Sequence, residues 1–382
     1  MRLLIVGDFC DCGRVEKLIS RGDYSTLFGG VKPIIDSVDL SVVNFEFPIV
    51  LDSSRTEPIQ KCGPNLKGQK KAVDSIKYAG FTVCTLANNH ILDQGGDCCM
   101  DTIHAIEESG MKTVGAGKDL REAADVLYMG INGKTLGIIN CCEHEYSIAT
   151  ETTPGANPLN PIQQYYKIKE AKAKADYVLV IVHGGHEHYN LPSPRMQELY
   201  RFFVDSGADA VVNHHQHCYS GYEVYNERPI FYGLGNFCFD RLNNSLPSSW
   251  HEGYMVELRF EEGNRVGFRL IPFTQCKKDP TVELMRDKER ESFFEAIERL
   301  NVVISNPNDL KKEHEEWMAS SGSRFEHQFL PYRNHWLISA HIRNLFPTFV
   351  SKEKLLLLQN HFECESHRER SLFALKRLLR KK

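Results

Sequence analysis

Three histidines, His214, His215 and His217, lie within four residues of one another, directly after the apolar run 208–212. A buried strand that ends in neutral imidazoles is a common way to build a transition-metal site. His215 and His217 are two residues apart, so in an extended or turning segment they could reach two ions, or two faces of one ion. A polar loop in which histidines merely cluster is the alternative that this segment leaves open.

Four other strand-like runs, at 2–7, 40–44, 81–86 and 177–182, end in residues of the same kind. The residues that follow these runs are Asp8, Glu46, Asn89 with His90, and His183. Alternation of strands and helices brings strand ends to one edge of a sheet, where these side chains can converge. Carboxylate, amide and imidazole groups suit Mn, Fe or Zn, and one carboxylate can bridge two such ions. The sequence therefore predicts a divalent metal site at this edge.

Helical segments are expected between these strands. Residues 68–79 carry apolar side chains at helical spacing, and further helices are expected at 97–109 and 193–205. Asn132-Gly133, between the runs 126–131 and 134–140, predicts a two-residue β-hairpin. Strands are also expected at 112–114, 254–260 and 266–273. Beyond about residue 275, charged helical stretches replace strands, which predicts one domain at 1–275 and a helical extension at 276–382.

Composition excludes several classes of protein. The 382-residue chain has a formal charge of −4, which gives no case for nucleic-acid binding. No apolar run approaches the roughly 18 residues needed to span a bilayer, and the first run is too short for a signal peptide. The twelve cysteines include no C-x-x-C pair and are expected to be reduced thiols. A cytoplasmic location, with peripheral attachment to the inner membrane face as an option, is expected.

Six motifs occur in a specific order along residues 1–275. They are VGD at 6–8, VNFEFPI at 43–49, LANNHILDQG at 86–95, HGGHEHY at 183–189, NHHQH at 213–217 and YGLGNFCFD at 232–240. With these motifs the chain resembles the CapA-type proteins of poly-gamma-glutamate capsule synthesis. These proteins are a branch of the calcineurin-like metallophosphoesterase superfamily. The resemblance implies an α/β fold, a four-layer α/β/β/α sandwich with a metal site at the carboxyl ends of its strands.

The resemblance also implies a role for each metal ligand. Asp8 and His217 would bind a first ion, and Glu46 would bridge it to a second. The ligands that complete the second ion would be Asn89, His183 and His215.

Other residues take expected roles around the ligands. His90 would act near the reacting phosphate as a general acid or as a charge stabiliser. Glu187 would either orient His183 or contact substrate. Asn236 and Asp240 are expected to fix the turn beneath the site, and Asp240 could also support a ligand. Cys10 stands where the wider superfamily has a histidine ligand, so its thiolate is a candidate ligand.

The function implied is a metal-dependent hydrolase, most simply a phosphoesterase, associated with capsule or surface-polymer biosynthesis. The alternatives are an accessory protein in anionic polymer assembly, with little or no catalysis, and a metal-dependent amide hydrolase. The expected substrate is a phosphoester or an anionic polymer. Residues 368–382 place Leu372, Leu375, Leu378 and Leu379 at helical spacing among basic residues. This pattern predicts docking on a membrane surface or a protein partner, and the alternative is a helix that closes the domain with a solvated basic face.

Overall fold

The computed structural model describes residues 1–241, 248–261, 263, 265–326, 335–343, 345, 351–363 and 365–379. It forms two compact units, Met1–Lys312 and Glu313–Lys382. The first unit contains both large β-sheets, and the second is helical.

The first sheet is built around β1 (Arg2–Cys10). Its eight strands run in the order β16-β15-β14-β1-β2-β3-β4, and β13 also pairs with β1. β1 is parallel to β2 and β13 and antiparallel to β14. The other strands are β2 (Leu40–Phe45), β3 (Val83–Thr85), β4 (Lys112–Val114), β13 (Asn236–Phe239), β14 (Glu252–Phe260), β15 (Val266–Gln275) and β16 (Val282–Leu284).

The second sheet has six strands in the order β11-β12-β10-β9-β7-β6. These are β6 (Leu127–Ile131), β7 (Lys134–Cys142), β9 (Tyr177–His183), β10 (Ala210–His214), β11 (Tyr222–Tyr225) and β12 (Arg228–Phe231). The predicted hairpin between β6 and β7 is confirmed, and its turn residues Asn132 and Gly133 have φ of 52° and 76°. Positive φ at both positions matches the twist of a tight hairpin.

The two sheets pack face to face. Because successive residues of a strand point to opposite sides, each strand contributes alternate side chains to the core between the sheets. In β1, Leu3 and Ile5 join the core between the sheets, while Leu4 and Val6 face the opposite layer. From the second sheet, Leu179 and Ile181 of β9 and Val212 of β10 enter the same inter-sheet core. This core fixes how the carboxyl ends of the two sheets meet.

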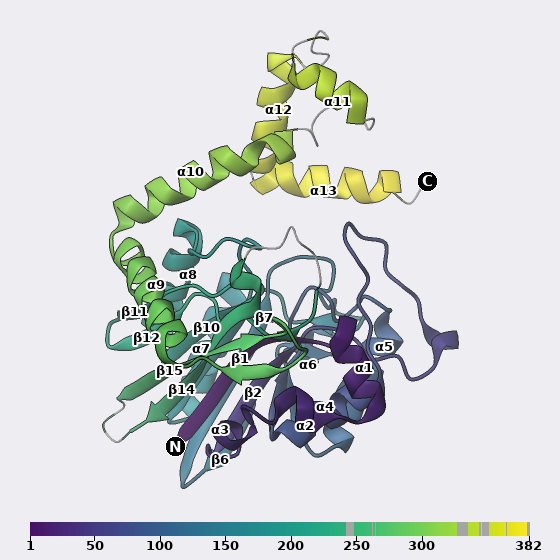
Figure 1. The fold of residues 1–382 in the computed structure, drawn as a ribbon. Coiled ribbons are helices and arrows are strands. Elements are labelled where there is room, and N and C mark those ends of the chain that lie inside the picture. Colours follow the sequence, from purple (N-terminus) through teal and green to yellow (C-terminus); the bar gives the residue numbers. More distant parts are fainter. Residues whose placement is uncertain are drawn as a thin grey trace. The chain divides into compact units, whose positions relative to one another are not determined.

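Helices cover the outer faces of both sheets (Figure 1). On the first sheet lie α1 (Gly13–Arg21), α2 (Tyr24–Phe28), α4 (Lys70–Ala79) and α5 (Gly96–Glu108). The predicted helical face is confirmed in α4, where Ala72, Val73, Ile76 and Ala79 are all buried. On the second sheet lie α7 (Pro161–Lys174) and α8 (Pro194–Ser206). The architecture is therefore the predicted four-layer α/β/β/α sandwich.

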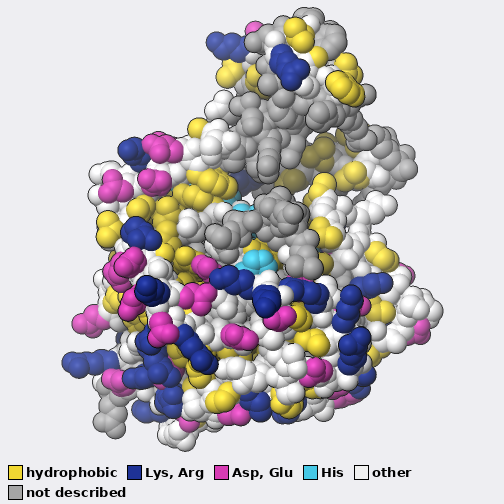
Figure 2. Space-filling view, viewed as in Figure 1, with side chains coloured by type: hydrophobic (Ala, Val, Ile, Leu, Met, Phe, Trp, Pro, Cys, Tyr) yellow, Lys and Arg dark blue, Asp and Glu magenta, His cyan; other side chains and the backbone are white. Residues whose placement is uncertain are grey.

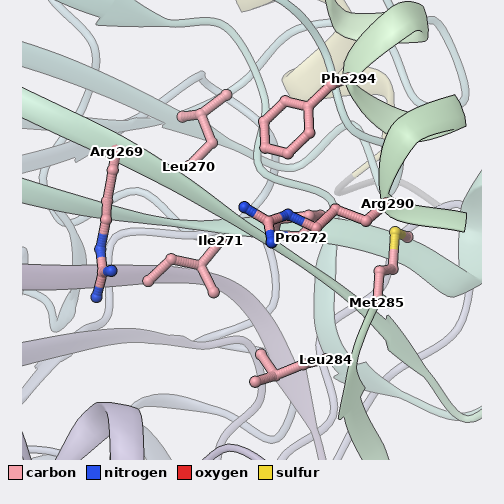
Figure 3. A pocket seen from close by; sticks show the side chains of 8 residues that line it. All are labelled: Arg269, Leu270, Ile271, Pro272, Leu284, Met285, Arg290 and Phe294. Carbon is pink, nitrogen blue, oxygen red and sulfur yellow. The ribbon is translucent and has the colours of Figure 1, made fainter. Parts of the chain in front are cut away.

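The first unit extends beyond the boundary expected near residue 275. β16 adds a strand to the first sheet, and α9 (Asp287–Ser305) buries Phe293 and Ile297 in the inter-sheet core. The Phe293 ring lies 4.8 Å from that of Tyr219 and 5.9 Å from that of Tyr254. The many charged residues of α9 suggested a helical segment outside the sheets. The opposite face of the same helix packs into the core between the sheets. Between α9 and β15 lies a surface groove of about 430 Å³, with Arg290 and Phe294 on its α9 side, which includes none of the predicted site residues (Figure 3).

The second unit holds α11 (His335–Ile342), α12 (Lys352–Glu363) and α13 (Glu365–Leu379), and α10 (Pro307–Glu326) leads into it. The four leucines of the predicted docking stretch are 51% to 71% exposed in α13. Residues 380–382 of that stretch lie outside the described residues. Among the described helices, none combines the length and apolar character needed to cross a bilayer. Docking on a membrane or partner stays a prediction.

One carboxylate in the first sheet makes stability depend on pH. Glu257 of β14 is fully buried and lies within 3.0 Å of nitrogen atoms of Arg2, Arg259 and Arg269. Burial alone would raise the pKa of Glu257, but the hydrogen bonds from the three arginines lower it from 4.5 to about 2. A lowered pKa stabilises the fold above the unfolded pKa, and this contribution is lost as the pH falls toward the folded pKa.

We therefore expect Glu257→Gln to destabilise the protein at pH 7 by about 1–3 kcal/mol, with the partly exposed arginines favouring the low end. The difference from wild type should shrink as the pH falls from 4.5 toward 2, because the wild-type carboxylate becomes protonated. Thermal unfolding at a series of pH values measures both effects. A difference that stays constant down to pH 2.5 would contradict this account.

Candidate metal centre

The predicted ligands meet where the carboxyl ends of the two sheets adjoin. Asp8 lies in β1 opposite Asn44 and Asn236, at an irregularity in the β1 pairing, and Glu46 directly follows β2. His183 is the last residue of β9, and His215 and His217 follow β10. The first sheet thus supplies the carboxylates and the second sheet supplies the imidazoles.

Two groups of three potential ligands share Glu46. One group contains Glu46, His183 and His215, the other contains Asp8, Glu46 and His217, and within each the ligand atoms lie within 4.8 Å of one another. Glu46 Oε1 is 3.6 Å from His183 Nε2 and 3.8 Å from His217 Nε2. The residues divide between two positions in the same way as in the assignment made from the sequence. The identity and number of the ions stay predictions.

Asn89 joins the first of these groups. Its Oδ1 lies 3.0 Å from His183 Nε2, which is itself 3.1 Å from His215 Nδ1. Ligand atoms at roughly 2.0–2.2 Å from one ion lie roughly 3–3.5 Å apart, so these spacings suit coordination of a single ion. The side chain of Asn89 is therefore placed for the ligand role predicted for it.

Glu46 is the residue whose surroundings most require a cation. Both of its carboxylate oxygens are buried and have no hydrogen-bond partner among the described residues. Burial raises the pKa of Glu46 well above its ordinary value, and the neighbouring charge of Asp8 acts in the same direction. Burial also raises the pKa of Asp8, to about 6. A buried carboxylate without a partner is costly, and a divalent ion between these groups would remove that cost. The residues present therefore fit a metal centre.

The histidines of the site are held in the form that binds metals. Burial, together with the neighbouring histidines, lowers the pKa of His183 and of His217 well below the ordinary value. Both are therefore neutral imidazoles near pH 7, with a nitrogen lone pair available for an ion. Burial lowers the pKa of His214 to about 3, but His214 ends β10 and belongs to neither ligand group.

The backbone is strained where these histidines leave β10. His215 and His217 have φ of 94° and 54°, in the left-handed region that non-glycine residues rarely adopt. Such conformations cost on the order of 1–3 kcal/mol each and occur preferentially at functional sites. The turn directs both imidazoles toward the carboxylates of the first sheet.

Two asparagines brace the ligands. Asn44 Nδ2 donates to Asp8 Oδ1 at 2.7 Å and lies 3.2 Å from His183 Nδ1, so it links the two sheets. Asn236 Oδ1 lies 2.8 Å from His217 Nδ1, which orients that ring as expected for a residue beneath the site. The sequence analysis gave Asn44 no role, although its position two residues before Glu46 is a signal for one.

His90 belongs to a buried cluster of three charged or titratable groups beside the ligands. Its Nδ1 lies 2.6 Å from Asp93 Oδ2, and Lys61 Nζ forms an ion pair with Asp93 and lies 3.1 Å from His90 Nδ1. Burial lowers the pKa of His90, and Asp93 opposes this shift. Because Asp93 binds Nδ1, Nε2 is the ring atom left for substrate. The i, i+3 spacing of His90 and Asp93 could have revealed this pair, whereas nothing local in the sequence points to Lys61.

Glu145 is a further residue that the sequence did not reveal. It accepts a hydrogen bond of 3.2 Å from Asn89 Nδ2, and its Oε2 lies 3.9 Å from His215 Nε2. Binding of Nδ2 by this carboxylate turns Asn89 Oδ1 toward His183. Glu145 therefore holds the asparagine in the orientation that a ligand needs.

Three predicted residues lie apart from the two ligand groups. Asp240 forms an ion pair of 2.9 Å with Arg14, which fixes the loop after β1, so its carboxylate is used there. Glu187 is half exposed and lies 4.0 Å from His188. Cys10 is in neither group, and burial raises the pKa of its thiol well above the ordinary value, which disfavours the thiolate that a metal requires.

The ligands lie just below the molecular surface. Figure 2 shows histidine side chains near the middle of this face, with lysine and arginine side chains along one side of them. Asn89, His90, His215 and His217 are 5% to 8% exposed, so a small group can reach them from solvent.

This combination of sandwich, strand-end ligands and shared glutamate is the one that the resemblance noted in the sequence implies for a metallophosphoesterase-type protein. Residues 2–241 match the family described as bacterial capsule synthesis protein PGA_cap, and the chain belongs to this family. The predicted resemblance to CapA-type proteins is thereby confirmed.

Individual relatives agree with this assignment. The capsule biosynthesis protein CapA of Bacillus anthracis is 36% identical over 250 residues, covering 63% of this chain and 60% of the relative. The PGA biosynthesis protein CapA of Bacillus subtilis is 35% identical over 240 residues, covering 62% of each. The chain thus spans about three fifths of these curated relatives. Among solved structures, the 5'-nucleotidase precursor of Thermus thermophilus is 13% identical with a TM-score of 0.42, covering 80% of this chain and 59% of that one.

Proposed function

We propose that this protein is a metal-dependent phosphoesterase that acts in the synthesis of an anionic surface polymer of the poly-gamma-glutamate kind. The observation that carries the proposal is the buried Glu46, which is shared by two groups of potential ligands and has no hydrogen-bond partner among the described residues. The names of the relatives support the link to capsule polymer. Two ions at these groups would supply an acidic water and a clamp for phosphoryl oxygens.

The residues of the chain then divide the work. Asp8 and His217 hold one position and Asn89, His183 and His215 hold the other, with Glu46 between them. Asp93 fixes the His90 ring through Nδ1, so that Nε2 can donate a proton to the leaving oxygen or stabilise charge on the phosphoryl group. Lys61 neutralises Asp93 and keeps the pair in place.

Metal analysis combined with a substrate screen tests the proposal. We expect the purified protein to bind Mn, Fe or Zn and to hydrolyse a generic aryl phosphate faster than gamma-glutamyl amides. Chelation should abolish the activity, and readdition of metal should restore it. Faster turnover of gamma-glutamyl substrates would favour the amide hydrolase instead.

An accessory role in polymer assembly is the second candidate. A Mycobacterium tuberculosis relative, 25% identical over 300 residues, is named as a probable polyglutamine synthesis accessory protein. Cys10 also stands in place of an expected histidine ligand. A protein that binds metal but hydrolyses neither phosphoesters nor amides would favour this candidate over the phosphoesterase.

A further inference from the structure

A cationic side chain stands beside the metal centre without a role in the proposed chemistry. Arg241 follows the last predicted motif, and its guanidinium carbon lies 5.7 Å from the ring centres of both Phe239 and Trp250. The two rings are buried and contact each other at 5.3 Å. Arg241 itself is only partly buried.

The same two rings support a predicted metal ligand. The His217 ring lies 5.1 Å from that of Trp250 and 5.2 Å from that of Phe239. Trp250 is fixed in turn, because its Nε1 donates to the Phe239 carbonyl at 3.0 Å. Arg241 and His217 therefore contact the same two aromatic rings, and His217 belongs to the ligand group that contains Asp8.

The charge of Arg241 is not neutralised by the described part of the chain, where no carboxylate forms an ion pair with it. By contrast, Arg14, Lys61 and Arg195 are paired with Asp240, Asp93 and Glu143. Contact with the ring faces holds the Arg241 guanidinium in place without using its N–H groups. A planar cation whose donors have no partner among the described residues matches the two oxygens of a phosphoryl or carboxylate group.

We propose that Arg241 is an oxyanion-binding residue that selects negatively charged substrates for the metal centre. The inference rests on the proposed function, since the oxyanion belongs to the molecule on which that centre acts. The oxyanion is a phosphoryl oxygen pair or a carboxylate, two groups that present the same geometry to a guanidinium. Arg241 is thus a specificity-determining residue and not a metal ligand.

Calorimetric titration of the metal-loaded full chain with inorganic phosphate, and separately with glutarate, tests the proposal. Arg241→Gln should weaken binding of the recognised anion by about 10–100-fold, the usual effect of losing charge-assisted hydrogen bonds. Weakened phosphate binding identifies a phosphoryl group, and weakened glutarate binding alone identifies a carboxylate. Arg241→Lys, which keeps the charge without the two-point geometry, should show an intermediate loss. Metal content should equal that of wild type in both variants.

Arg121→Gln is the matched control, because Arg121 is an exposed arginine of α6 (Leu120–Ala123) outside the site. It should bind both anions as the wild type does. The inference is overturned if Arg241→Gln binds as tightly as wild type, if Arg121→Gln is weakened equally, or if wild type binds neither anion. Turnover of aryl phosphate is scored separately. Its absence contradicts the phosphoesterase proposal while leaving the anion-binding result to decide the role of Arg241.

Discussion

Replacing His90 by alanine is expected to lower the rate of aryl phosphate hydrolysis by about 10²–10⁴-fold, the usual range for a positioned acid or base. Metal content should not change, because His90 belongs to neither ligand group. An acid must be protonated to act, so the wild-type rate should fall as the pH rises. This decrease of the rate at high pH should be absent from the pH profile of His90→Ala.

Steady-state kinetics together with metal analysis measure this prediction. His104→Ala is the control, because His104 is an exposed histidine of α5 and should behave as the wild type does. The hydrolysis rate of Asp93→Asn should lie between those of His90→Ala and His104→Ala, since this variant keeps the imidazole but removes the carboxylate that orients it. An active wild type with an equally active His90→Ala variant would exclude His90 from the chemistry.

Replacing Glu46 by glutamine should lower the affinity for metal but should not lower the stability of the metal-free protein at pH 7. Glu46 is shared by both ligand groups, so Glu46→Gln should weaken metal binding by more than about 100-fold, beyond the usual effect of losing a residue that only supports a ligand. Without metal, however, the variant should be at least as stable as wild type at pH 7. The reason is that wild type then holds a buried carboxylate without a partner among the described residues.

The sign of the pH dependence follows from the raised pKa of Glu46. A carboxyl group with a raised pKa in the folded state binds its proton more tightly there than when unfolded. Metal-free wild type should therefore lose stability as the pH rises above the ordinary value of 4.5, and Glu46→Gln should lose less. Thermal unfolding with and without Mn or Zn measures both effects. Glu151→Gln, at an exposed glutamate, is the control.

Two results would contradict the role given to Glu46. One is a Glu46→Gln variant that gains as much thermal stability from metal as wild type does. The other is a metal-free variant that is less stable than wild type at pH 7 but not at pH 4, which would show that the carboxylate is stabilised by a partner and not by an ion.

Local patterns in the sequence were enough to predict individual strands, helices and a hairpin, whereas the four-layer sandwich was implied by the family resemblance. Apolar runs ending in Asp8, Glu46 or His183 identify buried strands and the ends at which polar groups emerge. The helical spacing of α4 and the Asn132-Gly133 turn likewise depend only on residues a few positions apart. Such signals survive without knowledge of the fold, because the periods of strands and helices are properties of the backbone.

The predicted ligands converge for a related reason. Parallel strands that alternate with helices place their carboxyl ends at one edge of the sheet. The residues at these strand ends therefore predict which side chains lie close together. The sequence could not show that the carboxylate of Glu46 has no hydrogen-bond partner in the part of the chain that the structure describes. That feature arises only when Asp8, His183 and His217 arrive from two different sheets.

The first compact unit extends past the boundary predicted near residue 275, which the sequence could not show because helical character does not reveal what a helix packs on. α9 is rich in charge, yet two of its side chains, Phe293 and Ile297, complete the core between the sheets. A pattern of spaced apolar residues predicts an amphipathic helix and is silent about the surface that its apolar face covers. Only the tertiary structure joined this segment to the first unit.

The sequence by itself determined the strands and helices that have a clear periodicity, the side chains at the strand ends and the family to which they point. Only the tertiary structure decided the partners of those side chains. Lys61 reaches Asp93, Glu145 reaches Asn89 and Arg241 rests on Trp250. Lys61 and Glu145 lie in loops remote in sequence from the groups they contact, and no periodicity links them. Their placement depends on how the packed sheets bring the loops together, which is a long-range property of the folded chain.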